Sequence, residues 1–316
     1  MRNEYVQVSL QEYLEAKISV DARSINRDVE EACGSRLRNL ERVDVLDVGC
    51  GTGAGLMRLV ERVPNTKLID YTGLDQNPRN MQLANDATRQ RLSEAGFRQV
   101  GGDSTADGID ASTVRVADSK LEIQFRFVTG DIFAPIEQIS RQYDLVLAHT
   151  LLDLLPLSVA VDALGSRVGR GGMLYCAFNY DGVTSLFPQP RRKDELKLES
   201  LLLANYHRSM NDRRVNGIAP GGSRTGSSVY EAFQTSFDVV AYGPSDWSVF
   251  SFDPGYGADQ RLFLNAIVGM IAAEGTRNQG IDSKRLSDWF DFRIDQISND
   301  KFGLIVHQTD ILGTLR

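Results

Sequence analysis

The sequence predicts a doubly wound α/β fold, built on a mostly parallel sheet with helices on both faces. Apolar strand patterns alternate with helical patterns along residues 42–181, which is the order that gives right-handed parallel units. The first strand runs into a glycine-rich turn at residues 49–55, and Asp75 and Asp131 close two later strands. The chain has 316 residues, of which 42% are hydrophobic and 24% charged, so it can bury one sizeable core.

The segment 45–55 (VLDVGCGTGAG) is the most informative part of the chain. An apolar run contains the acidic Asp47, and four glycines then follow at every second position. Glycine is needed where the backbone takes a positive φ or where a ligand lies too close for a Cβ atom. The helical pattern resumes at residues 56–60, so free backbone N–H groups gather at a helix N-terminus, where they favour an anionic group. We therefore expect a ligand at this turn.

The second strand, residues 67–75, also ends in an acidic residue. Asp75 stands roughly twenty residues beyond the glycines, where nucleotide-binding sites place a carboxylate that accepts both ribose hydroxyl hydrogens. Asp75 is therefore expected to bind a ribose, with Gln76 beside it. Asp75 could instead cap the helix that begins near Pro78, since Asp is common before a helix start.

Three further strands are expected at residues 125–133, 143–149 and 171–178. The ligand crevice of a doubly wound sheet lies outside the carboxyl ends of its strands. His149 and Thr150, where the second of these strands ends, should therefore face the reactive end of a bound cofactor.

The run VLDVGCGTG as a whole resembles the first motif of class I S-adenosylmethionine (SAM) dependent methyltransferases, and the later strands follow it in the order of that family. The resemblance implies a seven-stranded sheet with an antiparallel last strand, in which residues 237–242 and 303–308 are strands six and seven. It also implies that SAM is the cofactor. The residues implied to bind SAM are Asp47, Gly49, Cys50, Gly51, Thr52 and Gly53 at its methionine end, Asp75 and Gln76 at the ribose, Asp131 and Ile132 at the adenine, and His149 and Thr150 at the reactive end.

Two other functions remain open at this point. Gly49, Gly51 and Ala54 also satisfy the dinucleotide pattern G-x-G-x-x-A, which would make the chain an NAD(P)-dependent oxidoreductase. Asp47 and the pattern of the seventh strand oppose that interpretation. The third alternative is a SAM-binding protein without catalytic activity, which the intact motifs oppose.

The segments outside the core are expected to enclose the methyl acceptor. The core needs only short connections, so the extra length indicates additions to it. A glycine-rich loop beside a helix suits a lid. The expected organisation is an N-terminal helical cap at 1–41, a SAM-binding core at 42–181, a lid insertion at 182–224, further core at 225–244, a helical insertion at 245–300 and the final core strand at 301–316.

Polar and aromatic residues of these additions are the candidates for binding the acceptor. His149 is the candidate general base, because the ordinary pKa of histidine is about 6.5. It could instead be a histidine that only hydrogen-bonds a backbone group beside SAM. The candidate acceptor-binding residues are Tyr13 and Arg23 of the cap, Asn179 and Tyr180 after the fifth strand, Tyr206, His207 and Arg213 of the lid, and Trp247 in an expected loop.

Composition narrows the classes of partner. The net charge of −7 and the lack of a dense basic block argue against nucleic acid, which is bound largely through its phosphates. No apolar run approaches the roughly twenty residues of a membrane span, and the N-terminus lacks the apolar core of a signal peptide, so a cytoplasmic protein without a membrane partner is expected. The three cysteines and three histidines are not at metal-ligand spacing, so neither a disulfide framework nor a metal is expected.

The expected reaction is methyl transfer from SAM to a small molecule. The fourth strand is followed by HTLL at residues 149–152, and not by the Asn/Asp-Pro-Pro-Tyr/Phe motif of enzymes that methylate nucleic-acid bases or glutamine amides. O- or N-methylation is expected rather than C-methylation. The sequence does not identify the acceptor, and association into a homodimer is left open.

Overall fold

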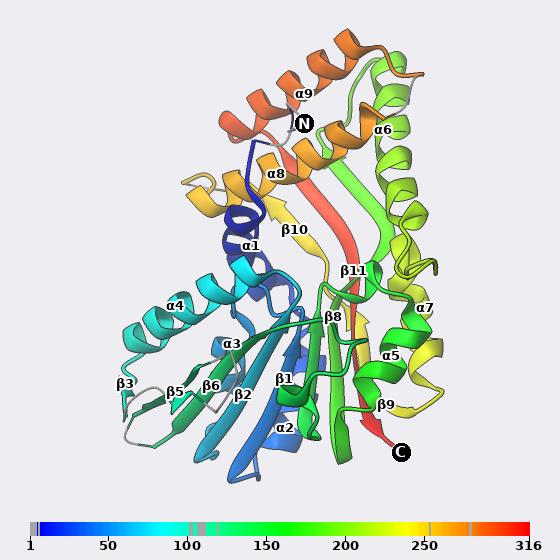
Figure 1. Cartoon of the computed structure of the whole chain (residues 1–316). Coiled ribbons are helices and arrows are strands. Elements are labelled where there is room, and N and C mark those ends of the chain that lie inside the picture. The colour runs from blue at the N-terminus through cyan, green and yellow to red at the C-terminus, as the bar shows by residue number, and fades with distance from the viewer. Residues whose placement is uncertain are drawn as a thin grey trace.

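A twisted sheet forms the centre of the computed structural model, and helices cover both of its faces (Figure 1). The structure describes residues 5, 7–100, 104–105, 112–118, 120–252, 254–277 and 280–316. The seven main strands are β1 (Arg42–Val48), β2 (Leu68–Asp75), β6 (Glu122–Thr129), β7 (Tyr143–His149), β8 (Val168–Phe187), β9 (Phe237–Pro244) and β11 (Gly303–Leu315). In the sheet, β6, β2, β1, β7 and β8 are parallel neighbours in that order, and the antiparallel β11 lies between β8 and β9. This is the class I methyltransferase fold, as the sequence predicts.

Four further described strands extend this sheet, and the sequence patterns did not predict them. At one edge, β5 (Ser112–Ala117) pairs antiparallel with β6, and β3 (Arg98–Gln99) and β4 (Ser104–Thr105) pair with β5. At the other edge, β10 (Trp247–Phe250) pairs with the first part of β11.

Alternate residues of β1 pack against helices on opposite faces of the sheet. Val43 and Val45 belong to a core that includes α2 and α3, whereas Leu46 and Val48 belong to a core that includes α5 and α7. None of the described helices is both long and apolar enough to span a membrane. The helices are α1 (Leu10–Ser24), α2 (Arg27–Leu37), α3 (Gly55–Arg62), α4 (Pro78–Glu94), α5 (Leu157–Gly165), α6 (Lys193–Asp212), α7 (Thr225–Phe233), α8 (Ala258–Gly275) and α9 (Ser283–Ser298), with short 3₁₀ turns η1 (Glu137–Ile139), η2 (Leu152–Leu154) and η3 (Gly222–Arg224).

β8 and β11 are longer than the sequence predicts and carry the additions to the core. Both strands continue upward in Figure 1, where α1, α6, α8 and α9 gather around their upper parts and β10. Their pairing shifts register twice, opposite His307 and opposite Asp310, and these bulges bend the ribbon between the lower and upper parts. The predicted boundary of the insertion at residue 182 is therefore wrong, because residues 182–187 are the last part of β8.

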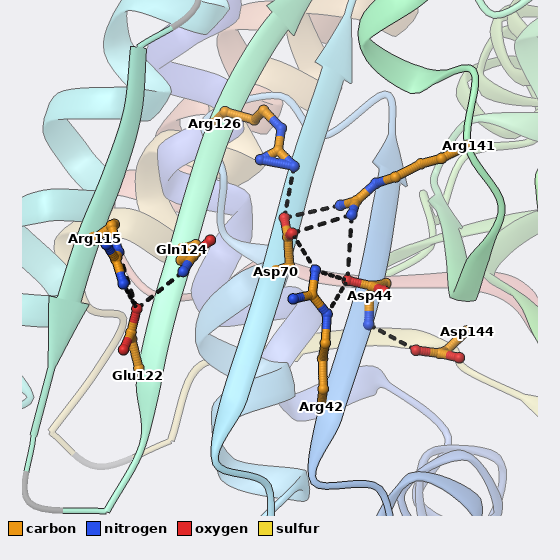
Figure 2. A network of polar contacts seen from close by, with 9 residues as sticks. All are labelled: Arg42, Asp44, Asp70, Arg115, Glu122, Gln124, Arg126, Arg141 and Asp144. Atoms are coloured by element: carbon orange, nitrogen blue, oxygen red, sulfur yellow. Dashed lines mark hydrogen bonds and ion pairs between the residues drawn. The ribbon is translucent and has the colours of Figure 1, made fainter. Parts of the chain in front are cut away.

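The predicted alternation of strands and helices is broken between β6 and β7, where the described connection contains only η1. A network of charged side chains lies on the sheet face there (Figure 2). The buried Asp70 carboxylate accepts hydrogen bonds from Arg42 at 2.7 Å, Arg126 at 2.7 Å and Arg141 at 3.1 Å. Charge pairing thus satisfies polar groups on a face that a crossover helix would otherwise cover.

A second charge pair joins the helices above the sheet. The fully buried guanidinium of Arg293 in α9 pairs with Glu199 in α6, and Trp289 Nε1 donates to the same carboxylate at 2.9 Å. Arg293 also donates to the Pro188 carbonyl oxygen at 2.9 Å, next to the end of β8. The pair therefore fixes α6 against α9 and against the top of the sheet.

Candidate functional site

The glycine turn after β1 has the positive φ angles that its sequence predicts. Gly49, Gly51 and Gly53 have φ angles of 70°, 53° and 78°, a region that favours glycine. The fourth glycine serves a different purpose. A Cβ atom at Gly55 would lie 2.3 Å from Oδ2 of Asp47, so this position allows the first turn of α3 to approach that carboxylate closely.

The turn, the start of α3, the end of β7 and one side of α1 enclose a cavity of about 60 Å³. The N-cap of α3, Ala54, has no side chain that could satisfy the first N–H groups of the helix. These donors and the positive end of the helix favour an anionic group at this point. The lining includes the predicted cofactor residues Asp47, Gly49, Cys50, Gly51, Thr52, His149 and Thr150.

Asp47 is buried at the floor of this cavity. It accepts a hydrogen bond from the Tyr71 hydroxyl at 2.6 Å. Burial raises the pKa of Asp47 to about 6, and the Tyr71 hydrogen bond and the charge of Arg58 only partly oppose the rise. Burial makes the charged form of this carboxylate unfavourable, and a cationic partner such as an ammonium group would stabilise it.

Asp75 holds the far side of the turn. Its carboxylate accepts from the backbone N–H of Gly51 at 3.1 Å and of Asn77 at 2.8 Å, and from Nδ2 of Asn80 at 3.3 Å. The N-cap of α4 is Asn77, so the alternative in which Asp75 caps this helix is wrong. Gln76 follows on the exposed surface.

The predicted adenine residues after β6 are only partly placed as expected. Asp131 is half-buried, and its Oδ1 accepts from the backbone N–H of Phe133 at 3.0 Å, which is the turn role that Asp commonly has. Ile132 is buried in the core below α5, so its side chain does not cover the face of a ring in an open cleft.

His149, the predicted base, is hydrogen-bonded by an arginine. Nη2 of Arg58 lies 3.1 Å from Nδ1 of His149. An arginine can only donate, so Nδ1 accepts and the neutral ring carries its proton on Nε2, which is buried without a hydrogen-bond partner among the described residues. Burial lowers the pKa of His149 well below 6.5, and the charges of Arg58 and Lys17 lower it further. This arrangement disfavours His149 as a general base.

A buried lysine that the sequence reasoning missed lies beside the end of β7. Nζ of Lys17 forms an ion pair with Asp21 and lies 3.3 Å from Oγ1 of Thr150. It also lies 5.8 Å from the ring centres of Phe178 and Trp247. The only sequence signal was a Lys and an Asp four residues apart in a predicted helix, which is usually a surface pair.

Two non-glycine residues have positive φ angles where β7 and β8 face this lysine. The angle is 50° at Thr150 and 59° at Phe178. The buried Asp310 carboxylate accepts from the Phe178 backbone N–H at 2.8 Å and helps to hold this conformation. Backbone strain of this kind clusters at binding and catalytic sites.

Trp247 belongs to the same cluster, but the predicted loop is wrong. It is the first residue of β10 and is buried, and its Nε1 donates to Asp21 at 2.9 Å. Its ring packs edge-on against Phe263 at 5.1 Å.

Tyr13, Tyr206 and Asp153 form a neighbouring group contributed by α1, α6 and η2. Burial raises the pKa of Tyr13 well above 10 and that of Tyr206 to about 12, and the charge of Asp153 adds to both rises. Burial also raises the pKa of Asp153 to about 6, while Arg213 and Lys17 oppose the rise. Sequence reasoning missed Asp153, although it follows β7 by only four residues.

Two other predicted acceptor residues, Asn179 and Arg23, lie in structural roles. Asn179 is fully buried, and its Nδ2 donates to the carbonyl oxygens of Cys176 and Thr309, which corrects its assignment to the acceptor. Arg23 is exposed and donates to the Ser19 carbonyl of its own helix at 3.1 Å, so it does not face the cavity either.

Tyr180 and His207 contact each other. The Tyr180 hydroxyl lies 2.6 Å from Nε2 of His207 and 2.9 Å from Oγ1 of Thr184. The pair connects β8 to α6. Among the described residues, no group of three or more His, Cys, Asp and Glu side chains could hold a metal ion.

Neither a protein-family model nor a curated protein sequence matches the chain. Solved structures align with most of its length. YjhP of Escherichia coli is 14% identical, with 95% of this chain and 99% of that chain covered and a TM-score of 0.46. SAM-dependent methyltransferases of Geobacter sulfurreducens and Thiobacillus denitrificans, both solved with S-adenosyl-L-homocysteine, are 14% and 13% identical. The first pairing covers 93% of this chain and 92% of that chain with a TM-score of 0.43, and the second covers 95% and 97% with 0.40. Likenesses at this level carry no information about the chemistry of this chain.

Proposed function

We propose that this protein transfers a methyl group from SAM to a small molecule. The observation that carries the proposal is the turn at Gly49, Gly51 and Gly53, which lies between the buried Asp47 and the carboxylate of Asp75 on a sheet of the methyltransferase order. The antiparallel β11 between β8 and β9 favours this function over an NAD(P)-dependent oxidoreductase, whose dinucleotide-binding sheet has no such strand.

The residues around the cavity fit the parts of SAM. The N–H groups at the start of α3 and the ammonium of Lys17 suit the carboxylate of its amino-acid end, and Asp47 suits the ammonium. Asp75 keeps unused acceptor positions on its carboxylate for ribose hydroxyl groups. In this proposal Asp131 contacts the adenine amino group through Oδ2, since Oδ1 already serves the turn.

α1 acts as the lid in this proposal. A pocket for a ligand of this size has a volume of roughly 300 Å³ or more, so the cavity of about 60 Å³ corresponds to a closed arrangement. Two contacts tie α1 to α4: Gln11 Nε2 donates to Asn80 Oδ1 at 3.0 Å, and Glu15 pairs with Arg91 at 2.7 Å. α1 must move outward for SAM to bind, and these contacts re-form when it closes.

The acceptor lies between α1, the end of β7 and α6. When bound, SAM supplies an activated methyl group on its sulfonium. The chain therefore has to hold the acceptor atom in line, exclude water and take up a proton if the acceptor is a hydroxyl or an ammonium group. Asp153 is the proposed proton acceptor, because it forms no ion pair with a described residue and lies close to Tyr13 and Tyr206.

The test is a methyl-transfer assay with SAM labelled in its methyl group and pools of amines, phenols and hydroxy acids. The proposal expects label in one of these classes, and expects Asp153→Asn to abolish transfer while SAM still binds. Binding of SAM without transfer to any class would support the non-catalytic alternative.

A further inference from the structure

A pocket of about 480 Å³ opens between α6 and α8 and shares no lining residue with the cavity at the glycine turn. Its lining is polar and rich in arginine. The residues are Asn205, Arg208, Ser209, Asp212, Arg213, Glu274 and Arg277.

Two of the three arginines in this pocket are unpaired. Nη1 of Arg277 lies 2.9 Å from both carboxylate oxygens of Glu274, so these two charges neutralise each other. The guanidinium groups of Arg208 and Arg213 form no hydrogen bond or ion pair within the described part of the chain. Asp212 is the remaining acidic group, and it forms no ion pair with a described arginine.

The unpaired arginines are not needed to satisfy the end of α6. Arg214 already donates to the carbonyl oxygens of Asn211 and Arg213, at 2.9 and 2.6 Å. A second pocket, between α6 and α9, gives a contrast. There Arg192 pairs with Asp194 at 3.1 Å, and Arg285 donates to the Asp194 carbonyl oxygen at 3.0 Å. The arginines of that second pocket are thus engaged, whereas Arg208 and Arg213 are not engaged by any described residue.

The helix that supplies most of this lining, α6, also carries Tyr206 of the proposed acceptor position. Burial raises the pKa of Tyr206, the charge of Asp153 adds to the rise, and the charges of Arg213 and Glu274 also act on it. Tyr206 thus lies within electrostatic reach of the lining residues Arg213 and Glu274 and of Asp153. The charge of Arg213, which lines the pocket, acts on Asp153 as well, so this arginine lies near both the pocket and that carboxylate.

We propose that this pocket binds an oxyanion group, phosphate or carboxylate, of the methyl acceptor. Arg208 and Arg213 supply the donors, since guanidinium groups bind such oxyanions with paired, charge-assisted hydrogen bonds. The role as an acceptor subsite rests on the proposed methyl transfer, whereas binding of the anion does not. The acceptor is then an anionic small molecule whose nucleophilic hydroxyl or amine reaches Asp153.

The first test is calorimetric titration of the full chain, saturated with S-adenosyl-L-homocysteine, with inorganic phosphate and separately with acetate. Bound S-adenosyl-L-homocysteine occupies the N–H groups at the start of α3, which could otherwise bind the added anion. The heat of anion binding then reports on the arginine pocket. Tighter binding of phosphate assigns a phosphorylated acceptor, and tighter binding of acetate assigns a carboxylate. Arg208→Gln and Arg213→Gln should each weaken the preferred anion about tenfold, as expected for loss of a charge-assisted hydrogen bond.

Arg192→Gln is the matched control, because it removes an exposed arginine at the start of the same helix. It should leave anion binding unchanged. Absence of binding of either anion up to tens of millimolar, or unchanged binding in the Arg208→Gln/Arg213→Gln double variant, would overturn the proposal. Both arginines are exposed, so their substitution should not disturb folding. Measurement of the melting temperature of each variant checks this.

The same preparations separate this inference from the proposed function. The double variant should bind S-adenosyl-L-homocysteine like the wild type. If the wild-type chain binds S-adenosyl-L-homocysteine but neither phosphate nor acetate, the oxyanion pocket is contradicted and the proposed function is not. A chain that binds the anion but neither SAM nor its product contradicts methyl transfer and leaves the anion site in place.

Discussion

Arg58 donates a hydrogen bond to Nδ1 of His149 beside the glycine turn, and burial of the ring, together with the charge of Arg58, lowers the pKa of His149 and keeps the imidazole neutral. Arg58 lies in α3, which follows β1, and His149 is the last residue of β7, the parallel neighbour of β1. The neutral ring of His149 therefore carries its proton on Nε2, and its lowered pKa disfavours it as a general base.

The first prediction concerns the titration of His149. Its imidazole should stay neutral well below pH 6.5 in the folded chain, and Arg58→Met should raise its pKa because a nearby positive charge is removed. The unfolded chain binds this proton more readily than the folded one, so the stability that a neutral His149 contributes is present above pH 6.5 and is lost as the pH falls. NMR titration of the ring protons measures both effects. Arg62→Met, one turn further along α3, is the control, and a His149 that titrates near 6.5 in the wild type would show that burial does not suppress its charge.

The second prediction concerns the loss of folding stability caused by the buried charge of Asp47. Its pKa of about 6 in the folded chain lies above the ordinary 3.8, so the charged form destabilises the ligand-free protein at pH 7; this cost shrinks as the pH falls below 6 and is gone below 3.8. Asp47→Asn should raise the stability of the ligand-free chain at pH 7 by on the order of 1–3 kcal/mol and weaken SAM binding. Chemical unfolding at pH 7 and pH 5 measures this. The gain should shrink at pH 5, and an equal loss of stability at both values would contradict the assignment.

The third prediction concerns the buried pair of Arg293 and Glu199. Arg293→Met leaves an uncompensated buried carboxylate and should destabilise the chain by about 3–5 kcal/mol. The double variant Glu199→Met/Arg293→Met removes both charges and should cost much less than the single one. Urea unfolding compares them, with Lys284→Met in the exposed pair with Asp288 as a control that should leave stability unchanged. A double variant less stable than Arg293→Met would show that packing, and not charge, decides the effect.

The core of the fold could be predicted because its signals are local. Apolar strands, the glycine turn and Asp75 depend on neighbours in the sequence, and the structure places them as expected. The acceptor side could not be predicted in the same way. Lys17 and Asp153 become significant only when α1 and η2 meet, and Asn179 looks like a site residue until β11 covers it.

The extents of β8 and β11 also escaped the sequence patterns. Predicted strands at 171–178 and 303–308 end where bulges interrupt the regular alternation, although both strands continue beyond those points. A bulge shifts the side-chain alternation by one position, so a period-two pattern breaks there.

The fourth prediction concerns the ion pair between Glu15 and Arg91, which we propose holds α1 closed. Glu15→Gln should increase the association rate constant of S-adenosyl-L-homocysteine about two- to fivefold, because opening of α1 precedes binding. Stopped-flow measurement of Trp247 fluorescence can follow this step, since Trp247 contacts α1 through Asp21. Glu12→Gln on the same helix is the control. An unchanged rate for Glu15→Gln, with faster binding for the control, would exclude this contact as the latch.

The most direct test of the central claim is calorimetric titration of the wild-type chain and of Asp75→Ala with SAM, S-adenosyl-L-homocysteine and NADH. The account predicts that the wild type binds the first two in the micromolar range and does not bind NADH. It also predicts that Asp75→Ala weakens binding by about 1.5–3 kcal/mol, because hydrogen bonds to a charged group are lost. Preferential binding of NADH by the wild type, or binding of SAM that is unaffected by loss of Asp75, would contradict the account.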